Sequence, residues 1–406
     1  MLNQHADLMN PMSIFLEREI ESKLLRRAAE GRLLTLRLDI INKCNLQCVM
    51  CHYSDPSVYR RKAEYITPEQ FETWLESIGK YVREVMLSCA DEPLMSKHFM
   101  EIISKAAKFN SDIEIGLCTN GMLMTSRIRN ALLANGVTFI LFSIDGAVRN
   151  TVERIRVKSN FNKIISNIKA LRDLKTVSGS SSPRIVVDFV MMKSNIHEAV
   201  AFVEMAYDLG ADIIDFRHAV PSEYWDDERE QLDNYPETFN FYRERILEAA
   251  GSLPIKVVIP DVFPSVEANV PDIPGIEVDL APYYAIKPDP ETETLQVTEN
   301  SDENSRPRIP PVRAEEFYAD AYCQRPFTEV MIRNQREVLP CPWHQKVLGH
   351  LDQENDLEQI FFGENFAALR ASMMRGETDP ACRQCPIMSG HLPTKKHSAT
   401  RTKSQK

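Results

Sequence analysis

Between residues 33 and 220, apolar segments alternate regularly with amphipathic ones. Strand-like segments lie at 33–42, 84–90, 112–119, 138–145, 184–193 and 212–220. Between them, helical spacing occurs near 67–80, 96–108, 124–135, 161–174 and 197–209. Strands that are apolar throughout, rather than at every second residue, are typical of a parallel sheet covered on both faces. The alternation therefore predicts an α/β fold whose sheet stays open or curls toward a barrel.

The unusual residues of this region follow the strands. Three cysteines in "CNLQCVMC" come after the first strand, "CADEP" ends the second, "CTNG" the third, "SIDG" the fourth and "DFRH" the sixth. The carboxyl ends of parallel strands meet at one edge of the sheet. We therefore expect a single site on that rim.

The remainder of the chain divides into four parts. Residues 1–32 include an amphipathic helix at 13–30, and residues 221–320 form an acidic, proline-rich insertion or linker with one helix near 235–250. A second set of cysteines lies in residues 321–390. The polar tail at 391–406 has no apolar anchor, which predicts disorder.

Charge and composition exclude some partners. A formal net charge of -10 gives a nucleic acid backbone little electrostatic reason to bind. No apolar run approaches the roughly 18 residues that cross a bilayer, so we expect no membrane contact and a cytoplasmic location. Thiols stay reduced there, and the 9 cysteines are more readily metal ligands, reactive groups or buried side chains than disulfides.

Cys44, Cys48 and Cys51 follow a C-x3-C-x2-C spacing. Three thiolates hold three irons of a four-iron, four-sulfur cluster and leave the fourth iron without a protein ligand. That open iron could bind a small chelating molecule and pass it an electron. The alternatives are a zinc site or chance, but zinc prefers four ligands in two pairs, which this spacing does not offer.

The segment "CNLQCVMC" after a first strand resembles the signature of radical S-adenosylmethionine (radical SAM) enzymes. The resemblance implies a partial (β/α)6 TIM-like barrel over residues 33–220. It also implies that S-adenosylmethionine binds the open iron of Cys44, Cys48 and Cys51, and that its cleavage yields a 5'-deoxyadenosyl radical which removes a hydrogen atom from the substrate. A reduced flavodoxin or ferredoxin would donate the electron.

The resemblance also assigns cofactor-binding roles. "ADEPL" matches the family's Gly-Gly-Glu-Pro segment, so Glu92 would hold the cofactor's ammonium, although Ala90 and Asp91 replace both glycines. Arg156 in "ERIRVK" would pair with the cofactor's carboxylate. The other cofactor residues that the rim motifs assign are Thr119, Asn120, Ser143 and Asp145. Taken singly, these residues could instead be a helix-end charge, a surface ion pair or a turn.

Two features near these motifs have other interpretations. Met50 stands where many family members carry an aromatic ring against the adenine. Cys118, at a strand end, is expected to be a core or pocket-wall side chain, because free cysteine packs as a small hydrophobe. The same is expected of Cys89.

The second cysteine set is Cys323, Cys341, Cys382 and Cys385. Its surrounding sequence resembles the SPASM or shorter twitch extension of radical SAM enzymes, which implies one fully ligated auxiliary 4Fe-4S cluster. A structural zinc has the same four-thiol requirement, and spacing does not separate the two. His344 and His350 are expected to be surface or pocket side chains rather than ligands.

Substrate is expected at the end of the sixth strand, where Asp215, Arg217 and His218 form a polar cluster. We expect a small polar substrate such as a sugar, aminocyclitol or nucleotide sugar, with dehydrogenation or epimerisation as the reaction. About 32 residues before the first strand are too few for the leader-binding domain that peptide-modifying members often carry. The alternatives are a peptide- or protein-modifying enzyme and a non-catalytic zinc-binding scaffold.

Overall fold

The computed structural model of the chain describes residues 34–88, 90–263, 278–289, 323–333, 336–352, 356–375, 379–382 and 385. Three predictions lie outside these residues. They are the leading helix at 13–30, the disordered tail at 391–406 and the buried position of Cys89.

Ten strands of the described chain form one sheet in the order β12-β11-β10-β1-β3-β4-β5-β7-β8-β9. The strands from β10 to β9 along this order are parallel, and β11 and β12 add an antiparallel edge. Their bounds are β1 (Leu34–Leu38), β3 (Val82–Leu87), β4 (Glu114–Thr119), β5 (Phe139–Ser143), β7 (Arg184–Met191), β8 (Ile213–His218), β9 (Lys256–Val258), β10 (Glu329–Ile332), β11 (Glu337–Leu339) and β12 (Gly349–His350). The sheet does not close, because the strands at its two ends do not pair with each other.

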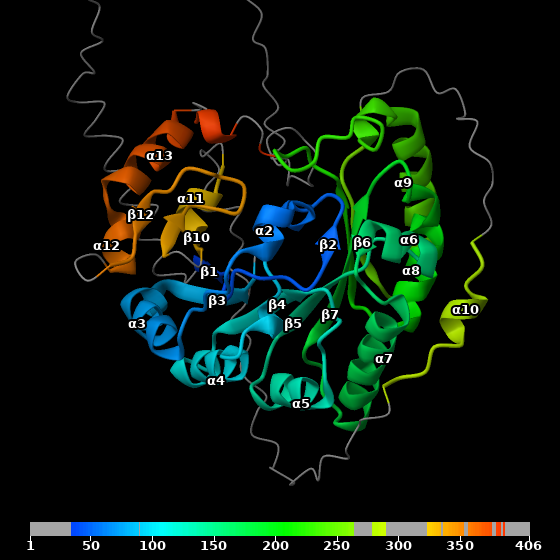
Figure 1. Ribbon diagram of the computed structural model, residues 1–406, viewed down its shortest axis with the longest axis horizontal. Coiled ribbons are helices and arrows are strands. Elements are labelled where there is room, and N and C mark those ends of the chain that lie inside the picture. Colours follow the sequence, from blue (N-terminus) through cyan, green and yellow to red (C-terminus); the bar gives the residue numbers. More distant parts are fainter. Residues whose placement is uncertain are drawn as a thin grey trace, which may run out of the picture.

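Helices cover the convex side of this curved sheet, and a small two-stranded ribbon lies over its concave side (Figure 1). The ribbon pairs β2 (Gln47–Cys48) with β6 (Arg156–Val157). The helices are α2 (Pro56–Arg60), α3 (Pro68–Ile78), α4 (Phe99–Phe109), α5 (Ser126–Ala134), α6 (Arg149–Ile155), α7 (Phe161–Val177), α8 (Ala199–Asp208), α9 (Pro236–Gly251), α10 (Ala281–Tyr284), α11 (Arg325–Thr328), α12 (Leu357–Phe362) and α13 (Glu364–Met374).

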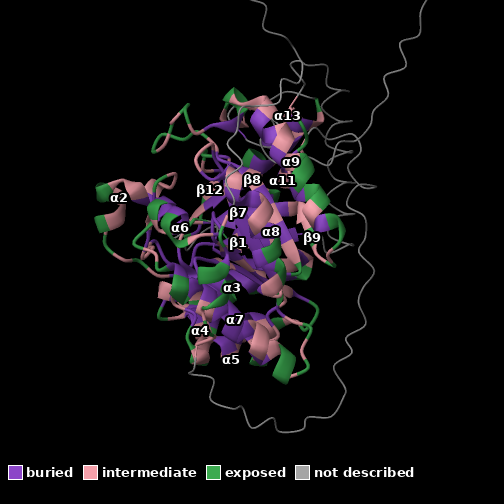
Figure 2. Cartoon of the chain, turned by 90° about the vertical axis from the view of Figure 1, so that its right-hand side faces the viewer, coloured by how far each residue is buried: buried purple, intermediate pink, exposed green. Residues whose placement is uncertain are grey.

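The core lies between the sheet and the outer helices. Figure 2 shows the strands buried, with exposed residues on the outer sides of the helices. On the convex face, Phe189 of β7 and Phe216 of β8 pack their rings against Phe202 of α8. On the concave face, Phe139 covers Gly116, where a Cβ would lie 2.1 Å from the ring. A larger residue at position 116 would therefore displace the aromatic ring.

The predicted strands and helices of residues 33–220 are all present, as β1, β3, β4, β5, β7 and β8 with α3, α4, α5, α7 and α8 between them. The alternation of strands and helices continues beyond residue 220. The helix expected near 235–250 is α9, and β9 after it pairs parallel with β8. In the cysteine-rich part, β10 pairs parallel with β1 and extends the same sheet.

A segment of the acidic, proline-rich region crosses the outer helices. Residues 278–289 run along α7 and α8, where the Tyr283 hydroxyl donates to an Asp208 carboxylate oxygen at 2.6 Å. At the end of this segment, Asp289 lies 3.1 Å from Nη2 of Arg129, whose side chain is fully buried in α5. The Arg129 guanidinium also donates to the Met124 carbonyl at 2.7 Å.

Asp289→Ala is expected to lower the free energy of unfolding by about 1–3 kcal/mol, because it removes a charged partner of a buried guanidinium. Anaerobic urea denaturation measures the change. Asp173→Ala removes an aspartate of α7 whose side chain is 42% exposed and is the matched control; we expect less than about 0.5 kcal/mol from it. Equal effects of the two substitutions would contradict the proposed anchoring role.

Candidate active site

The three clustered cysteines lie in the loop that connects β1 to α2, on the concave side of the sheet (Figure 1). Within this loop, Cys48 belongs to β2 and pairs antiparallel with Arg156 of β6. Arg156 directly follows α6, so the short ribbon brings an arginine that is 108 positions away in sequence next to the second thiol. The pairing thus explains how two separate motifs meet.

Each of the three sulfurs faces one polar side chain. Asn120 Nδ2 lies 3.8 Å from Cys44 Sγ, Arg156 Nη1 lies 3.9 Å from Cys48 Sγ, and His52 Nδ1 lies 3.7 Å from Cys51 Sγ. These partners come from three different elements. Hydrogen-bond donors around sulfur stabilise the thiolate form that binds iron.

The pKa values of the three thiols shift in different directions, although burial acts to raise all of them. Burial raises the pKa of Cys48 to about 12 despite the opposing charge of Arg156, and it also raises the pKa of Cys44. At Cys51 burial acts in the same direction, but the hydrogen bond and charge of His52 outweigh it, and the pKa is lowered. Without iron, Cys44 and Cys48 are therefore neutral thiols, and metal binding must displace their protons.

Glu92 is a buried carboxylate that accepts three hydrogen bonds. Its donors are the Thr119 hydroxyl at 2.7 Å, the Asn120 amide at 2.8 Å and the Leu94 amide at 3.2 Å. Burial raises the pKa of Glu92 to about 7, against the lowering effect of these hydrogen bonds. The bond to Leu94 also makes Glu92 the cap of a short 3-10 turn at Pro93–Met95, which is close to the helix-end role weighed from the sequence.

Arg156 and Asp145 form a second buried pair, with Nη2 and Oδ2 2.7 Å apart. Asp145 adopts a left-handed backbone conformation with φ of 65°, and its Oδ1 accepts from the Val190 amide at 2.8 Å. Among the described residues, the Arg156 Nε has no hydrogen-bond partner. A buried guanidinium edge without a partner is suited to a further acceptor, such as a carboxylate.

A row of polar side chains crosses the concave face below this pair. In register, Ser143 of β5 is adjacent to Asp188 of β7, and Asp188 is adjacent to Asp215 of β8. Arg217 joins the row, with its Nε 3.1 Å from an Asp188 oxygen and 3.0 Å from an Asp215 oxygen. Cys118 lies beside the row, its sulfur 3.7 Å from the Ser143 hydroxyl.

The structure corrects one prediction about this region. His218 does not join Asp215 and Arg217, because successive residues of a strand point to opposite faces. Its ring packs against Phe239 and Phe263 on the helix side, at centroid distances of 4.4 and 5.0 Å. Met50 likewise packs against an apolar cluster of Ile155, Met192 and Ala219.

Sequence reasoning missed Asp188, although a signal was present. It is the one charged residue inside the apolar run "IVVDFVMM". Burial raises the pKa of Asp188 to about 7, while the Arg217 charge opposes this rise. A buried carboxylate with a pKa near neutrality is a candidate for proton transfer.

Comparison with known proteins gives two family matches. Residues 38–206 match the Radical SAM superfamily, and residues 323–386 match the SPASM iron-sulfur cluster-binding domain. The chain therefore contains a radical SAM domain followed by a C-terminal SPASM domain. These matches confirm the family resemblance and the fold class that the sequence predicted.

Individual relatives are distant. The chain is 30% identical over 185 residues to a probable GTP 3',8-cyclase of Methanocaldococcus jannaschii, covering 45% of this chain and 58% of the relative. It is 25% identical over 240 residues to PqqA peptide cyclase of Bradyrhizobium diazoefficiens, covering 57% of this chain and 59% of the relative. The chain thus spans about half the length of the curated relatives it matches.

A solved structure confirms the fold alone. The crystal structure of Streptococcus suis SuiB bound to S-adenosylmethionine superposes with a TM-score of 0.59. Its sequence identity to this chain is 14%, and the alignment covers 91% of this chain and 75% of SuiB.

The residues of the radical SAM domain fit its cofactors, S-adenosylmethionine and a 4Fe-4S cluster. Three thiols with polar partners can bind iron. The buried Glu92 carboxylate, with its raised pKa, needs a cation to be stable in its ionised form, and the cofactor's ammonium is one. The unpartnered Arg156 Nε can receive a carboxylate.

The SPASM cysteines converge from separate elements. Cys323 precedes α11, Cys341 follows β11, and Cys382 and Cys385 follow α13. Their charges interact, since the other three thiols contribute to raising the pKa of Cys382 to about 12, after the larger effect of burial. Close to these thiols in sequence, His344 is buried and its Nε2 lies 3.5 Å from an Asp379 oxygen.

The match to the SPASM iron-sulfur cluster-binding domain implies an iron-sulfur cluster at these four thiols. Within the part of the chain that the structure describes, no three His, Cys, Asp or Glu side chains form a group that could hold one metal ion. Thiolates on a four-iron cluster each bind a different iron, so they lie farther apart than ligands of one zinc.

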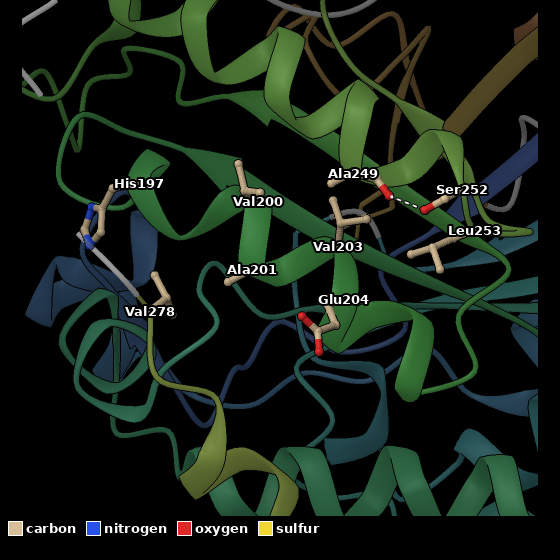
Figure 3. Close-up of a pocket in the computed structure, with 9 residues that line it drawn as sticks. All are labelled: His197, Val200, Ala201, Val203, Glu204, Ala249, Ser252, Leu253 and Val278. Atoms are coloured by element: carbon tan, nitrogen blue, oxygen red, sulfur yellow. Dashed lines mark hydrogen bonds between the residues drawn. The ribbon is translucent and has the colours of Figure 1, made fainter. Parts of the chain in front are cut away.

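A surface hollow lies away from this site. A shallow surface hollow between α8 and α9 is lined mainly by apolar side chains, including Val200, Leu253 and Val278 (Figure 3). It opens on the outer helical layer, whereas the cysteines lie on the concave side of the sheet.

No helix among the described residues is long and apolar enough to span a membrane.

Proposed function

We propose that this radical SAM enzyme removes a hydrogen atom from a small polar substrate, such as a sugar, aminocyclitol or nucleotide sugar, and that the usual outcome is dehydrogenation. The observation that carries the proposal is the row of Ser143, Asp188, Asp215 and Arg217 on the concave face, in which Asp188 is buried and the other three are partly exposed. Carboxylates accept from hydroxyl and ammonium groups, and the guanidinium donates to substrate oxygens. A cytoplasmic location and a reduced flavodoxin or ferredoxin as electron donor are part of the same proposal.

The chain's own residues orient the reactants. Cys44, Cys48 and Cys51 would hold the open cluster, Glu92 the ammonium of S-adenosylmethionine, and Arg156 its carboxylate. Asp145 keeps the Arg156 guanidinium in place, and Thr119 and Asn120 keep Glu92 in place. When bound, the cofactors supply a 5'-deoxyadenosyl radical that takes one hydrogen atom from a substrate C–H bond.

Oxidation of an alcohol carbon to a carbonyl then requires the loss of one proton and one electron. Asp188 is positioned to accept the proton, because its carboxylate is buried on the concave face and its pKa of about 7 suits a general base. The thiols of the SPASM domain would hold the cluster that accepts the electron. Hydrogen abstraction followed by these two losses balances a two-electron oxidation.

The test uses candidate polyols deuterated at single carbons, with the anaerobically reconstituted enzyme and a chemical reductant. We expect deuterium in 5'-deoxyadenosine and one 5'-deoxyadenosine per product that is lighter by two hydrogens. A product in which hydrogen has replaced the deuterium of the labelled carbon, with no further loss of hydrogen, would indicate epimerisation instead. Deuterium that never reaches 5'-deoxyadenosine would exclude hydrogen abstraction from the labelled carbon.

Asp188→Asn is expected to lower product formation about 10- to 100-fold, since it removes one hydrogen-bonding charge from the substrate row. The slow cleavage of S-adenosylmethionine without substrate should stay within about twofold of wild type. Liquid chromatography of both products measures the two rates. Asp227→Asn alters an aspartate that pairs with Arg229 in the exposed loop after β8 and serves as the control. Equal loss of both rates would show that Asp188 supports the cofactor site rather than the substrate.

A peptide- or protein-modifying activity is the second candidate, favoured by the match to PqqA peptide cyclase over 57% of this chain. Incubation with candidate polypeptides and mass spectrometry distinguishes it from the first. The third, a zinc-binding scaffold, is tested by metal analysis of anaerobically purified protein. Colourless protein with zinc and no iron would support the scaffold.

A further inference from the structure

His52 lies between the third cysteine of the trio and a carboxylate. Its Nδ1 is 3.7 Å from Cys51 Sγ, and its Nε2 is 3.8 Å from an Asp91 oxygen. Asp91 occupies the second glycine position of the Gly-Gly-Glu-Pro motif, so this chain replaces a residue without a side chain by a partner for His52.

Other side chains hold Asp91 in place. The Tyr53 hydroxyl donates to the same Asp91 oxygen, and Arg61 Nη2 lies 3.3 Å from it. Arg61 is itself fixed, because its Nε donates to the Asn42 carbonyl at 2.9 Å. The Asp91 side chain is only 7% exposed, and the carboxylate is therefore a fixed acceptor for the imidazole.

Aromatic neighbours restrict the imidazole ring. The ring centroid of His52 lies 4.3 Å from that of Tyr53 and 6.0 Å from that of Tyr224. The ring is oriented with Nδ1 toward the Cys51 sulfur and Nε2 toward the Asp91 carboxylate, so an N–H at Nδ1 points at the sulfur.

The partners of the other two thiols have additional roles. Asn120 also donates its backbone amide to Glu92, and Arg156 also pairs with Asp145. The polar partners of His52 among the described residues, in contrast, are Cys51 and Asp91. A hydrogen bond to a cluster sulfur disperses the negative charge that reduction adds, and it therefore raises the reduction potential.

We propose that His52, oriented by Asp91, is a positioning residue that donates a hydrogen bond to the Cys51 sulfur and raises the reduction potential of the open cluster. The proposal rests on the trio binding this cluster and does not depend on the substrate. Under this proposal, Asp91 at the second glycine position of the motif makes the cluster easier to reduce.

The test is a potentiometric titration of the anaerobically reconstituted full chain, followed by electron paramagnetic resonance. The open cluster is recognised by the change of its signal when S-adenosylmethionine is added, and the auxiliary cluster is an internal reference. At the wild-type midpoint potential, we expect the ratio of reduced to oxidised open cluster to fall about tenfold in His52→Ala, which is ~59 mV for one electron. Asp91→Gly and His52→Gln should give intermediate decreases.

His98→Ala is the matched control, because His98 packs against Tyr65 before α4 and is not a partner of the trio. Its open cluster should keep the wild-type midpoint. If His52→Ala fails to bind the cluster, His52→Gln and Asp91→Gly decide the result. Wild-type midpoints in the variants that bind the cluster would overturn the proposal, as would an equal shift of the auxiliary cluster. Wild-type protein without any open cluster would instead refute the proposed function.

Discussion

Cys48→Ala is expected to abolish cleavage of S-adenosylmethionine and to reduce bound iron from about eight to about four atoms per chain. Cys48 is central to the trio, since it is paired with Arg156 across the β2–β6 ribbon. An open cluster that has lost one of its three ligands has two irons without a protein thiolate. The SPASM thiols lie on other elements and should keep their cluster. Iron analysis and 5'-deoxyadenosine formation by chromatography measure the two effects.

Cys118→Ala is the control for this substitution, because Cys118 belongs to neither cysteine set. Its thiol lies beside Ser143, and burial raises its pKa to about 11, so it is a neutral thiol in the interior. Iron content should therefore be unchanged. Retention of cofactor cleavage by Cys48→Ala would refute the assignment of the trio, whatever the iron content.

Glu92→Gln is expected to weaken binding of S-adenosylmethionine by about 2–5 kcal/mol, or roughly 30-fold to several thousandfold. The amide keeps the size of the side chain but removes the negative charge that would face the cofactor's ammonium. Isothermal titration calorimetry on anaerobic, cluster-loaded protein measures the dissociation constant. The conservative control is Thr119→Ser, which preserves the hydroxyl that donates to Glu92. Wild-type affinity in Glu92→Gln would contradict the ammonium assignment.

The pH dependence of binding tests the same carboxylate. Burial raises the pKa of Glu92 to about 7 from its ordinary value of 4.5, so the cofactor-free protein holds a proton there below pH 7. Binding of the ammonium requires the ionised form and must release this proton. Affinity should therefore fall by up to about tenfold per pH unit as the pH drops from 7 to 5.5. In Glu92→Gln, this component of the pH dependence should be absent.

The same shift has a consequence for stability. Because the folded-state pKa of Glu92 is above its unfolded value, the group contributes stability below about pH 4.5 and loses it as the pH rises through 7. At neutral pH, the buried and ionised Glu92 carboxylate lowers the stability of the folded protein. Binding of the cofactor's ammonium offsets this loss. This cost is typical of binding sites rather than of structural ion pairs.

The strand positions were predictable because burial on both faces leaves a continuous apolar run in the sequence. The same rule explains why the sequence did not predict β9. β9 is only three residues long, Lys256–Val258, and a strand of this length gives no distinct pattern. The helix before it, α9, was visible because it is 16 residues long. Sheet membership of β10 could not be predicted, since it depends on pairing with β1, nearly 300 residues earlier.

For the site, the sequence predicted which residues lie at the carboxyl-end edge of the sheet, but not which side chains they contact. It placed Asp215, Arg217 and His218 together, whereas strand alternation separates His218 from the other two. It did not identify Asp188, because a single acidic residue in an apolar strand can be assigned to a site only when the adjacent residues on β5 and β8 are known. It also treated Asp91 only as a missing glycine, because the contact with His52 joins positions that lie far apart in sequence.

By itself, the sequence determined the cysteine sets, the order of strands and helices, and the resemblance to the radical SAM family. These features depend on local composition and short-range spacing, which are fully present in the chain. Tertiary structure alone decided which side chains meet, namely Arg156 with Cys48, Asp188 with Arg217 and His52 with Asp91. The physical reason is that charge and hydrogen bonding act over a few ångströms, and only folding brings such residues within that range.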